Sequence, residues 1–274
     1  MKLRVGIIGA GAMAEALIRG LLNSGTLPEQ LIASDVLPAR LSYIQSQYGI
    51  RTSTSNRKVC ESSDVIILAV KPQNLEEVLQ ELAGFADQLL ATASSLPLII
   101  SIAAGITIRF VEGLLPLPFP VIRAMPNTPS VVGQGATALS PGSHVRVEHE
   151  AQARSIFEAV GIVVSVPEAQ MDAVTGLSGS GPAYGYLIIE ALADAGVRVG
   201  LPRATALKLA AQTMAGAARM VMDTAQHPGV LKDQVTSPGG TTIAGLQVME
   251  RRGLRGILID AVVAAATRAS ELKR

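Results

Sequence analysis

The sequence of 274 residues contains no tryptophan, four phenylalanines, four tyrosines and one cysteine, Cys60. A single cysteine excludes an internal disulfide, and we expect a reducing, cytoplasmic location. No apolar run approaches the roughly 18 residues that a membrane-spanning helix needs, and we expect no signal peptide at the N-terminus. The formal net charge of +1 gives no electrostatic reason to expect nucleic acid or an anionic membrane as a partner.

Hydrophobic residues make up 49% of the chain and charged residues 16%, so there is enough apolar material for a large core. Because aromatic residues are scarce, alanine and glycine are expected to let helices approach one another closely. Such helices are common in chains that pack against a copy of themselves, although ordinary alanine-rich helices account for them almost as well. The length predicts two domains, at about 100–200 residues per domain.

Short β-branched runs alternate with amphipathic stretches over about the first 165 residues. Strands are predicted at 3–8, 31–34, 65–70, 98–102, 121–125, 136–139 and 162–166, and helices at 12–23, 39–47, 75–82, 108–114 and 146–160. This alternation is typical of a parallel sheet with helices on both faces.

The β pattern ends near Val166, and the rest of the chain is predicted to be helical. Apolar residues recur at helical spacing in the stretches 183–195, 207–221 and 254–272, with the first of these helices ending at Gly196. We therefore predict an α/β fold in which a Rossmann-type dinucleotide-binding domain, residues 1–166, precedes an all-helical domain, residues 167–274.

A glycine-rich turn, Gly9-x-Gly11-x-x-Ala14, follows the first predicted strand and opens the first predicted helix. Gly9 permits the tight turn, Gly11 lets the backbone approach a pyrophosphate, and Ala14 allows close packing of helix on strand. The pattern alone also fits a glycine turn in some other α/β protein. Its place in the first β–α unit favours a dinucleotide.

Asp35 ends the second predicted strand, where an acidic side chain binds the adenosine ribose hydroxyls of NAD. A carboxylate there would repel the additional phosphate of NADP, whereas Arg40, one helical turn further on, could offset that repulsion. In the alternative, Asp35 caps the next helix. We expect NADH or NADPH as the cofactor, with Asp35 shifting the preference toward NADH.

A second loop of small and hydroxyl residues interrupts the helical half, Val235-Thr236-Ser237-Pro238-Gly239-Gly240-Thr241-Thr242. Its two glycines let backbone N–H groups face one point, and the following helix adds unpaired N–H groups with a partial positive charge. Thr241 and Thr242 add hydroxyls. The loop is predicted to bind a small carboxylate, and the active site to lie where the two glycine-rich loops meet.

Six motifs follow one another along the chain, and together they closely resemble the pyrroline-5-carboxylate reductases, which make L-proline. They are Ile8-Gly9-Ala10-Gly11-Ala12-Met13, Ala69-Val70-Lys71-Pro72, Ser101-Ile102-Ala103-Ala104-Gly105, Met125-Pro126-Asn127-Thr128-Pro129, Gly176-Leu177-Ser178-Gly179-Ser180-Gly181-Pro182-Ala183-Tyr184, and His227-Pro228-Gly229 through Thr242. The resemblance covers nearly the whole chain. Each motif is modestly specific by itself, and the last, placed after the other five, is highly specific.

The resemblance implies a set of binding residues. Ile8 to Met13 would wrap the pyrophosphate, Asn56 and Ala69 to Pro72 would line the nucleoside side, and Ala103 to Gly105 with Met125 to Asn127 would approach the nicotinamide. Val235, Ser237, Gly239, Gly240, Thr241 and Thr242 would bind the substrate, with Thr242 and Ser237 as catalytic hydrogen-bonding groups. Asp35 is a departure, because many members look NADP-preferring and carry a small polar or basic residue in this region.

The resemblance also implies that the helical domain forms a homodimer, and such dimers often build larger rings such as a decamer. Reducing a cyclic imine needs a hydride on carbon and a proton on nitrogen, so an imine bound in its protonated form requires no strong general base. Two alternatives differ in class. A hydroxyacid dehydrogenase, or another imine reductase, would share the architecture, and a non-enzymatic dinucleotide sensor would need no second anion site.

Alcohol oxidation requires a general acid or base, commonly a lysine on the first helix of the second domain, and the chain has no lysine between Lys71 and Lys208. That absence favours an imine over an alcohol as substrate. No metal site is predicted, because the three histidines match no ligand spacing. His144 and His149 are expected on the surface, His227 is expected to have a structural role, and Cys60 is expected to be unreactive.

Overall fold

The computed structural model describes residues 3–92 and 95–273, and the chain divides into two compact units. The first unit comprises Met1–Gly179 and Ala265–Arg274, and the second comprises Ser180–Ala264. The domain boundary predicted between residues 166 and 167 stays a prediction, because compact units need not coincide with functional domains. Among the described residues, no helix combines the length and apolar character needed to cross a membrane.

An eight-stranded sheet forms the centre of the first unit, in the order β3-β2-β1-β4-β5-β6-β7-β8. The strands are β1 (Val5–Ile8), β2 (Leu31–Ser34), β3 (Arg51–Ser53), β4 (Val65–Leu68), β5 (Leu98–Ser101), β6 (Val121–Met125), β7 (Gly135–Pro141) and β8 (Gly161–Ser165). The order of the first six strands is that of a dinucleotide-binding doubly wound sheet, which confirms the predicted fold class.

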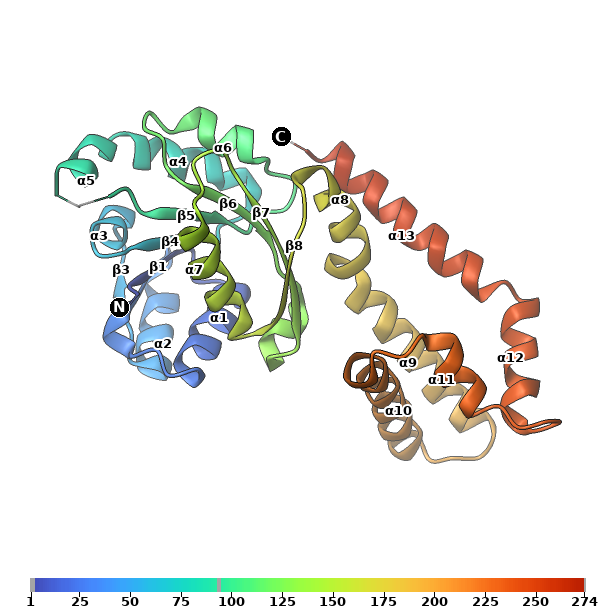
Figure 1. Ribbon diagram of the computed structural model, residues 1–274. Helices are drawn as coiled ribbons and strands as arrows, with labels where there is room; N and C mark the ends of the chain where they lie inside the picture. The colour runs from blue at the N-terminus through green and yellow to red at the C-terminus, as the bar shows by residue number, and fades with distance from the viewer. Residues whose placement is uncertain (1–2, 93–94, 274) are drawn as a thin grey trace. The chain divides into compact units, whose positions relative to one another are not determined.

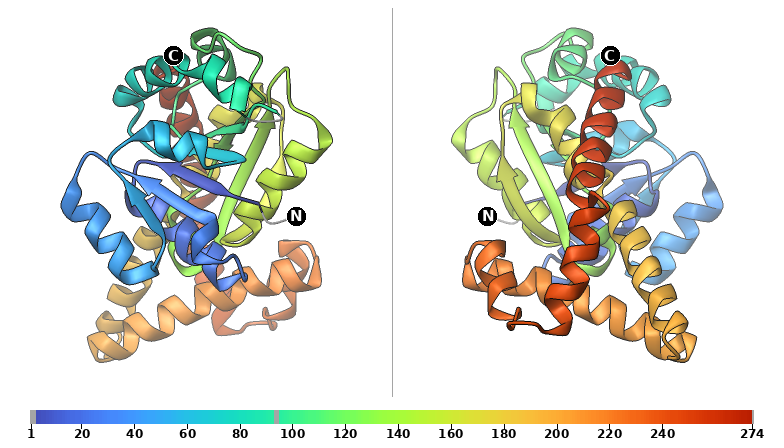
Figure 2. Two further views of the ribbon diagram at one scale, coloured as in Figure 1. Left: turned by 90° about the vertical axis from the view of Figure 1, so that its left-hand side faces the viewer. Right: turned by 90° about the vertical axis from the view of Figure 1, so that its right-hand side faces the viewer.

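Helices cover both faces of this sheet, because alternate residues of the buried strands point to opposite sides (Figure 1). One face packs against α1 (Ala12–Asn23), α2 (Pro38–Tyr48) and α7 (Val147–Glu158). The other face packs against α3 (Asn56–Glu61), α4 (Leu75–Ala83), α5 (Ala86–Thr92) and α6 (Ile108–Leu114). The two layers of helices can also be followed in Figure 2.

The end of α1 shows how the local sequence sets a boundary. Gly25 has a φ of +96°, its N–H donates to the carbonyl of Leu22, and the N–H of Thr26 donates to that of Leu21. This is a Schellman motif, which needs a residue that tolerates left-handed backbone. The helix end predicted at Gly25 is therefore confirmed.

The predicted parallel sheet has one exception, because β7 runs antiparallel to β6. The connection from Met125 to Gly135 holds only a short 3-10 helix, η3 (Thr128–Val132). A parallel neighbour would need a crossover of about a dozen residues or more, usually with a full helix. The connection from β7 to β8 contains α7, and these two strands are parallel.

Two further expectations are corrected in this unit. The edge strand β3 was not predicted, because its sequence Arg-Thr-Ser has no apolar alternation to reveal it.

His149 was expected on the surface, but only 9% of it is exposed. It lies in the first turn of α7, where its Nδ1 accepts the backbone N–H of Arg146 at 3.1 Å, so the ring is held against its own helix.

The second unit is helical, as predicted. It contains α9 (Gly181–Arg198), α10 (Arg203–Thr224), α11 (Pro228–Gln234), α12 (Thr241–Arg251) and the first part of α13 (Leu254–Glu271). The expected helix end at Gly196 is wrong, because α9 continues to Arg198 and the left-handed residue is Gly200. Gly196 instead packs against α10, where an added Cβ would come within 2.8 Å of the Ala206 side chain.

Alanines form the small core of the second unit. The buried residues Ala193, Ala206 and Ala210 bring α9 and α10 together. By contrast, large apolar side chains elsewhere on α9 and on α13 are exposed, among them Leu187, Ile257, Ile259 and Val263. A unit that leaves this much apolar surface in water has a surface fit for a protein partner.

Candidate functional site

The first glycine-rich loop lies between β1 and α1, as predicted. Gly9 has a φ of +94°, and a Cβ there would lie 2.8 Å from the carbonyl oxygen of Ala69, so glycine is required. Gly11 is the N-cap of α1 and makes no side-chain hydrogen bond to the helix. The first-turn N–H groups of Ala12 and Met13 therefore remain open for an anion such as a pyrophosphate.

Asp35 directly follows β2 and lies beside this loop. Its Oδ2 accepts the backbone N–H of Ala10 at 2.8 Å, and its Oδ1 accepts the N–H of Leu37 at 2.9 Å. The N-cap of α2 is Leu37, so the alternative in which Asp35 occupies that position is wrong. Each carboxylate oxygen keeps a second lone pair, which leaves Asp35 able to accept ribose hydroxyls.

Arg40 connects the same loop to α1. Its Nε donates to the carbonyl of Ala10 at 2.5 Å, and its Nη2 lies 2.5 Å from Oε2 of Glu15. The other oxygen of Glu15 accepts the hydroxyls of Tyr48 at 2.7 Å and Tyr43 at 3.1 Å. Burial opposes ionisation of Glu15, but the hydrogen bonds from Arg40 and both tyrosines outweigh it and lower the pKa of the carboxyl.

Asn56 is the first residue of α3 and links three elements. Its Oδ1 accepts the hydroxyl of Ser34 at 2.7 Å, and its Nδ2 donates to Oε2 of Glu81 at 2.6 Å. The stretch from Ala69 to Pro72 joins β4 to the 3-10 helix η2 (Pro72–Asn74), and Lys71 is the exposed N-cap of that helix. The structure thus brings Asn56 to the carboxyl end of β2, on the predicted nucleoside side.

The predicted nicotinamide side includes the segment from Met125 to Asn127. The Asn127 side chain makes two hydrogen bonds, donating to the carbonyl of Ser178 at 2.9 Å and accepting the N–H of Ala136 at 2.8 Å. Met125 lies under Gly179, where an added Cβ would come within 2.7 Å of the methionine methyl group. Ser178 and Gly179 belong to a π-helical turn, η5 (Thr175–Gly179), a geometry that is frequent at functional sites.

The stretch from Ala103 to Gly105 follows β5 and meets the C-terminal end of α13. Gly105 has a φ of +76°, and a Cβ there would lie 2.8 Å from the carbonyl oxygen of Leu272. The adjoining Lys273 binds Asp172 at 3.0 Å. The loop after β5 and the end of the chain, about 170 positions apart, are therefore neighbours in space. No local sequence pattern predicts this contact.

Arg123 on β6 is a buried cation that sequence reasoning missed. Only 3% of the residue is exposed, and its guanidinium lies 3.3 Å from Glu168 and 3.9 Å from Asp172. Glu168 also accepts the backbone N–H of Ile108 at 2.7 Å. This cluster joins β6, which ends at Met125, to the segment that precedes the π-helical turn. It therefore stabilises two of the segments on the predicted nicotinamide side.

The second loop adopts a tight turn in the second unit. The N–H of Gly240 donates to the carbonyl of Ser237 at 3.1 Å, with Pro238 and Gly239 (φ +67°) between them, as in a type II turn. A Cβ on Gly240 would lie 2.3 Å from Oγ of Ser237, so the two residues can approach this closely only with glycine.

The turn leads directly into α12, with Gly240 as an N-cap that makes no side-chain hydrogen bond. Thr241 and Thr242 are the first two helical residues, and Thr242 is half-buried while Thr241 is exposed. The structure therefore brings Ser237, Gly239, Gly240, Thr241 and Thr242 to one helix N-terminus, which favours an anion. Val235 lies apart from them at the C-terminal cap of α11 and is 66% exposed.

Lys232 is a further residue near this turn that sequence reasoning missed. It lines a hollow of about 640 Å³ with Gly239, Gly240 and the face of α12 that carries Ile243 and Gln247. Its ammonium group lies 2.7 Å from Asp233. A cation ahead of a glycine-rich turn is a signal that could have identified it.

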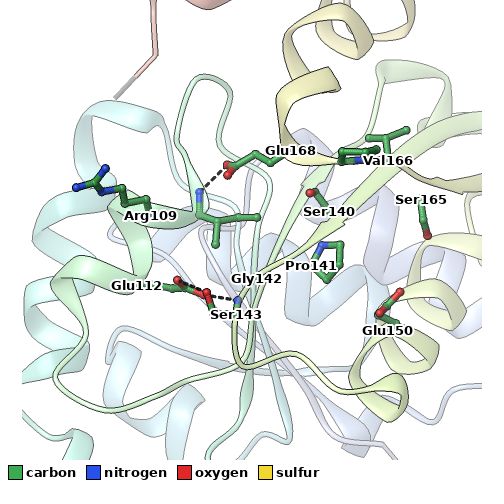
Figure 3. A pocket seen from close by; sticks show the side chains of 12 residues that line it. Arg109, Glu112, Ser140, Pro141, Gly142, Ser143, Glu150, Ser165, Val166 and Glu168 are labelled. Carbon is green, nitrogen blue, oxygen red and sulfur yellow. Dashed lines mark hydrogen bonds between the residues drawn. The ribbon is translucent and has the colours of Figure 1, made fainter.

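A separate hollow of about 820 Å³ opens between α6 and the ends of β7 and β8 (Figure 3). Glu112 faces it and accepts the N–H of Ser143 at 2.9 Å, while Glu168 accepts the N–H of Ile108 across it. None of the residues predicted to bind cofactor or substrate lines this hollow. It lies outside the candidate site.

Cys60 and His227 lie outside the candidate site and have structural roles. Burial raises the pKa of the Cys60 thiol to about 12, which agrees with the expectation that it is unreactive. Nδ1 of His227 accepts the N–H of Gly229 at the start of α11, so this histidine caps a helix. Within residues 3–92 and 95–273, no group of three or more His, Cys, Asp or Glu side chains could hold a metal ion.

Two family models match the chain in sequence. Residues 4–105 match the family described as NADP oxidoreductase, coenzyme F420-dependent, and residues 168–272 match pyrroline-5-carboxylate reductase dimerisation. The first match covers the glycine-rich loop and Asp35. The second covers the whole of the turn from Ser237 to Thr242.

Known proteins resemble the chain over its full length. A pyrroline-5-carboxylate reductase of Synechocystis sp. is 50% identical over 273 residues, which are 99% of each chain. The structure of a pyrroline-5-carboxylate reductase from Coxiella burnetii has a TM-score of 0.93 at 38% identity, with all of both chains covered. That of a Plasmodium falciparum pyrroline carboxylate reductase with NADP bound has a TM-score of 0.86 at 31% identity, again over both whole chains.

Proposed function

Because the chain belongs to the pyrroline-5-carboxylate reductase family, we propose that it reduces 1-pyrroline-5-carboxylate to L-proline with NADPH or NADH. One structural observation carries the proposal beyond family membership. The turn from Ser237 to Gly240 presents an uncapped helix N-terminus with two threonines, as a small carboxylate substrate requires. A dinucleotide sensor or a simple hydride carrier would have no use for this second anion site.

The first unit supplies the cofactor residues of this proposal. Ile8 to Met13 bind the pyrophosphate, chiefly through the N–H groups at the start of α1. Asp35, Asn56 and the stretch from Ala69 to Pro72 form the adenosine side. The stretches from Ala103 to Gly105 and from Met125 to Asn127 approach the nicotinamide, and the hydrogen bonds of Asn127 hold the second stretch in place.

The second unit supplies the substrate residues. The backbone N–H groups of Gly240 and of the first turn of α12 orient the substrate carboxylate, together with Ser237 and Thr241. Thr242 hydrogen-bonds to the reacting end of the ring. When bound, the reduced nicotinamide supplies a hydride to the carbon of the C=N bond. If the imine enters protonated, its nitrogen keeps that proton as the amine of proline, so Thr242 and Ser237 position the ring and need not transfer a proton.

The proposed assembly is a homodimer formed through residues 167–274, which could build a larger ring such as a decamer. The match to a dimerisation domain and the exposed apolar residues of α9 and α13 support it. We expect light scattering at micromolar concentration to give at least twice the chain mass of 28.4 kDa. Ile259→Glu should lower that mass if α13 forms the interface, whereas a monomer in the unaltered protein would contradict the proposal. A cytoplasmic location is proposed alongside it.

Steady-state reduction of 1-pyrroline-5-carboxylate with each cofactor in parallel tests the proposed function. We expect oxidation of the cofactor to match the proline formed, one to one. A 2-hydroxy acid offered with the oxidised cofactor should give no reaction. Turnover of the hydroxy acid in place of the imine would overturn the proposal, and tight cofactor binding without any turnover would favour a sensor.

A further inference from the structure

The adenosine end of the proposed cofactor site combines three carboxylates with one guanidinium. Asp35 is bonded to the glycine-rich loop, Glu15 rises from the first turn of α1, and Glu81 holds the side-chain amide of Asn56. Arg40 is bonded to the loop as well. These four side chains together carry a net negative charge beside the loop that an additional phosphate would approach.

Two of the three guanidinium nitrogens of Arg40 already have protein partners. Its Nε is bonded to Ala10 and its Nη2 to Glu15, and its guanidinium lies 5.0 Å above the ring of Tyr43. The Arg40 and Glu15 side chains are only 26% and 23% exposed, so solvent screens their attraction less than it screens a surface pair. A two-point phosphate contact through the terminal nitrogens Nη1 and Nη2 would therefore compete with the bond from Nη2 to Glu15.

We propose that Glu15 is a specificity-determining residue, because by holding Arg40 it leaves Asp35 unopposed and makes the protein prefer NADH over NADPH. This inference rests on the proposed binding of a nicotinamide dinucleotide at the glycine-rich loop. The hydroxyls of Tyr43 and Tyr48 both donate to Oε1 of Glu15, whereas Arg40 is bonded to the other oxygen, Oε2.

The cations on α3 and β3 do not replace Arg40. Arg57 is paired with Glu61 at 2.7 Å and donates to Gln88 at 2.6 Å. Arg51 and Lys58 line a hollow of about 410 Å³ along β3, and Glu61 lines the same hollow. Arg51 is the first residue of β3 and Ser53 the last, so Arg51 lies at the opposite end of the strand from Asp35.

The test compares the dissociation constants of NADH and NADPH, measured by cofactor fluorescence without substrate, and then their kcat/KM values. The unaltered protein should bind NADH about tenfold or more tightly than NADPH. Glu15→Gln keeps the shape of the side chain and removes its charge, and it should move the ratio about fivefold or more toward NADPH, through the KM for NADPH. Asp35→Ser should move it in the same direction.

Three variants separate this role from a general structural effect. Arg40→Gln alone should leave the NADPH constant nearly unchanged, but in the Glu15→Gln background it should abolish the gain. Tyr48→Phe removes a hydroxyl from the same carboxylate while keeping the Arg40 pair, so its ratio should equal that of the unaltered protein. If Glu15→Gln does not fold, Asp35→Ser with and without Arg40→Gln tests the premise: because Glu15 still holds Arg40 in both, their NADPH dissociation constants should be equal, and weaker NADPH binding without Arg40 would overturn the inference.

Two results would overturn the inference. One is an unaltered protein that prefers NADPH and loses that preference in Arg40→Gln, because Arg40 would then bind the phosphate despite Glu15. The other is an unchanged ratio in a folded Glu15→Gln variant. Failure to reduce pyrroline-5-carboxylate would contradict the proposed function instead, since the two binding constants would still be measurable.

Discussion

The side-chain amide of Asn127 donates a hydrogen bond to the carbonyl oxygen of Ser178 at 2.9 Å, and this bond joins two motifs that are 51 residues apart. Asn127 follows the last residues of β6, and Ser178 lies in the π-helical turn before α9. The amide oxygen of Asn127 accepts the N–H of Ala136 as well. One side chain therefore fixes the end of β6, the start of β7 and the turn against one another.

Replacing Asn127 by alanine should destabilise the protein and weaken cofactor use together. The loss of two partly buried hydrogen bonds should lower the free energy of unfolding by about 1–3 kcal/mol, because the Ser178 carbonyl and the Ala136 N–H lose their partner. Urea unfolding measures this, and the KM for the cofactor should rise in parallel. Asn74→Ala, at an exposed site, is the matched control. Equal midpoints for both variants would contradict this role of Asn127.

Replacing Thr242 by alanine should lower kcat/KM by about ten- to a hundredfold, the effect of losing one transition-state hydrogen bond worth roughly 1.5–3 kcal/mol. The measurement is steady-state reduction of pyrroline-5-carboxylate at a saturating cofactor concentration. Thr205→Ala, on the exposed first turn of α10, controls for the loss of a hydroxyl and a methyl group. An unchanged rate in a folded Thr242→Ala variant would remove Thr242 from the mechanism.

Replacing Arg123 by methionine should lower the free energy of unfolding by about 1–3 kcal/mol, because a buried side chain loses a charged hydrogen bond. Glu168 would lose its cation, whereas Asp172, whose side chain is only 15% exposed, would keep Lys273. Chemical denaturation measures the change. The same substitution at the exposed Arg109 should cost much less. If both variants unfold at the same denaturant concentration, the cluster contributes nothing to stability.

His149 should make the stability of the protein depend on pH. Burial, and then the nearby Arg146 guanidinium, lower the pKa of this ring below its usual value of 6.5, while Glu148 acts in the opposite direction. Between the lowered pKa and 6.5 the unfolded chain binds more protons than the folded one. The stability is therefore present above pH 6.5 and is lost as the pH falls through the pKa of the folded state.

Urea unfolding at a series of pH values between about 7.5 and 5 measures this loss. His149→Gln should show a shallower fall in stability than the unaltered protein. His144→Gln should match the unaltered protein, because His144 is exposed. A steeper fall in His149→Gln would show that the protonated ring stabilises the fold.

Much of this protein was determined by local sequence. Gly9, Gly25 and Gly239 all adopt left-handed backbone, so their places in the chain mark the first loop, the end of α1 and the second loop without any tertiary information. The alternation of β-branched runs and amphipathic stretches predicted seven of the eight strands to within two residues of their limits, and it predicted the fold class that the structure confirms. The order of the six motifs identified the family.

Tertiary structure alone decided the relationships between distant residues. The burial of His149 and Arg123 follows from packing, and the contact of Gly105 with Leu272 joins residues far apart in the chain. The bond between Arg40 and Glu15 is of the same kind, since the two lie on different helices. Sequence periodicity reports which face of an element is apolar, whereas pairing of charges depends on which elements meet in space.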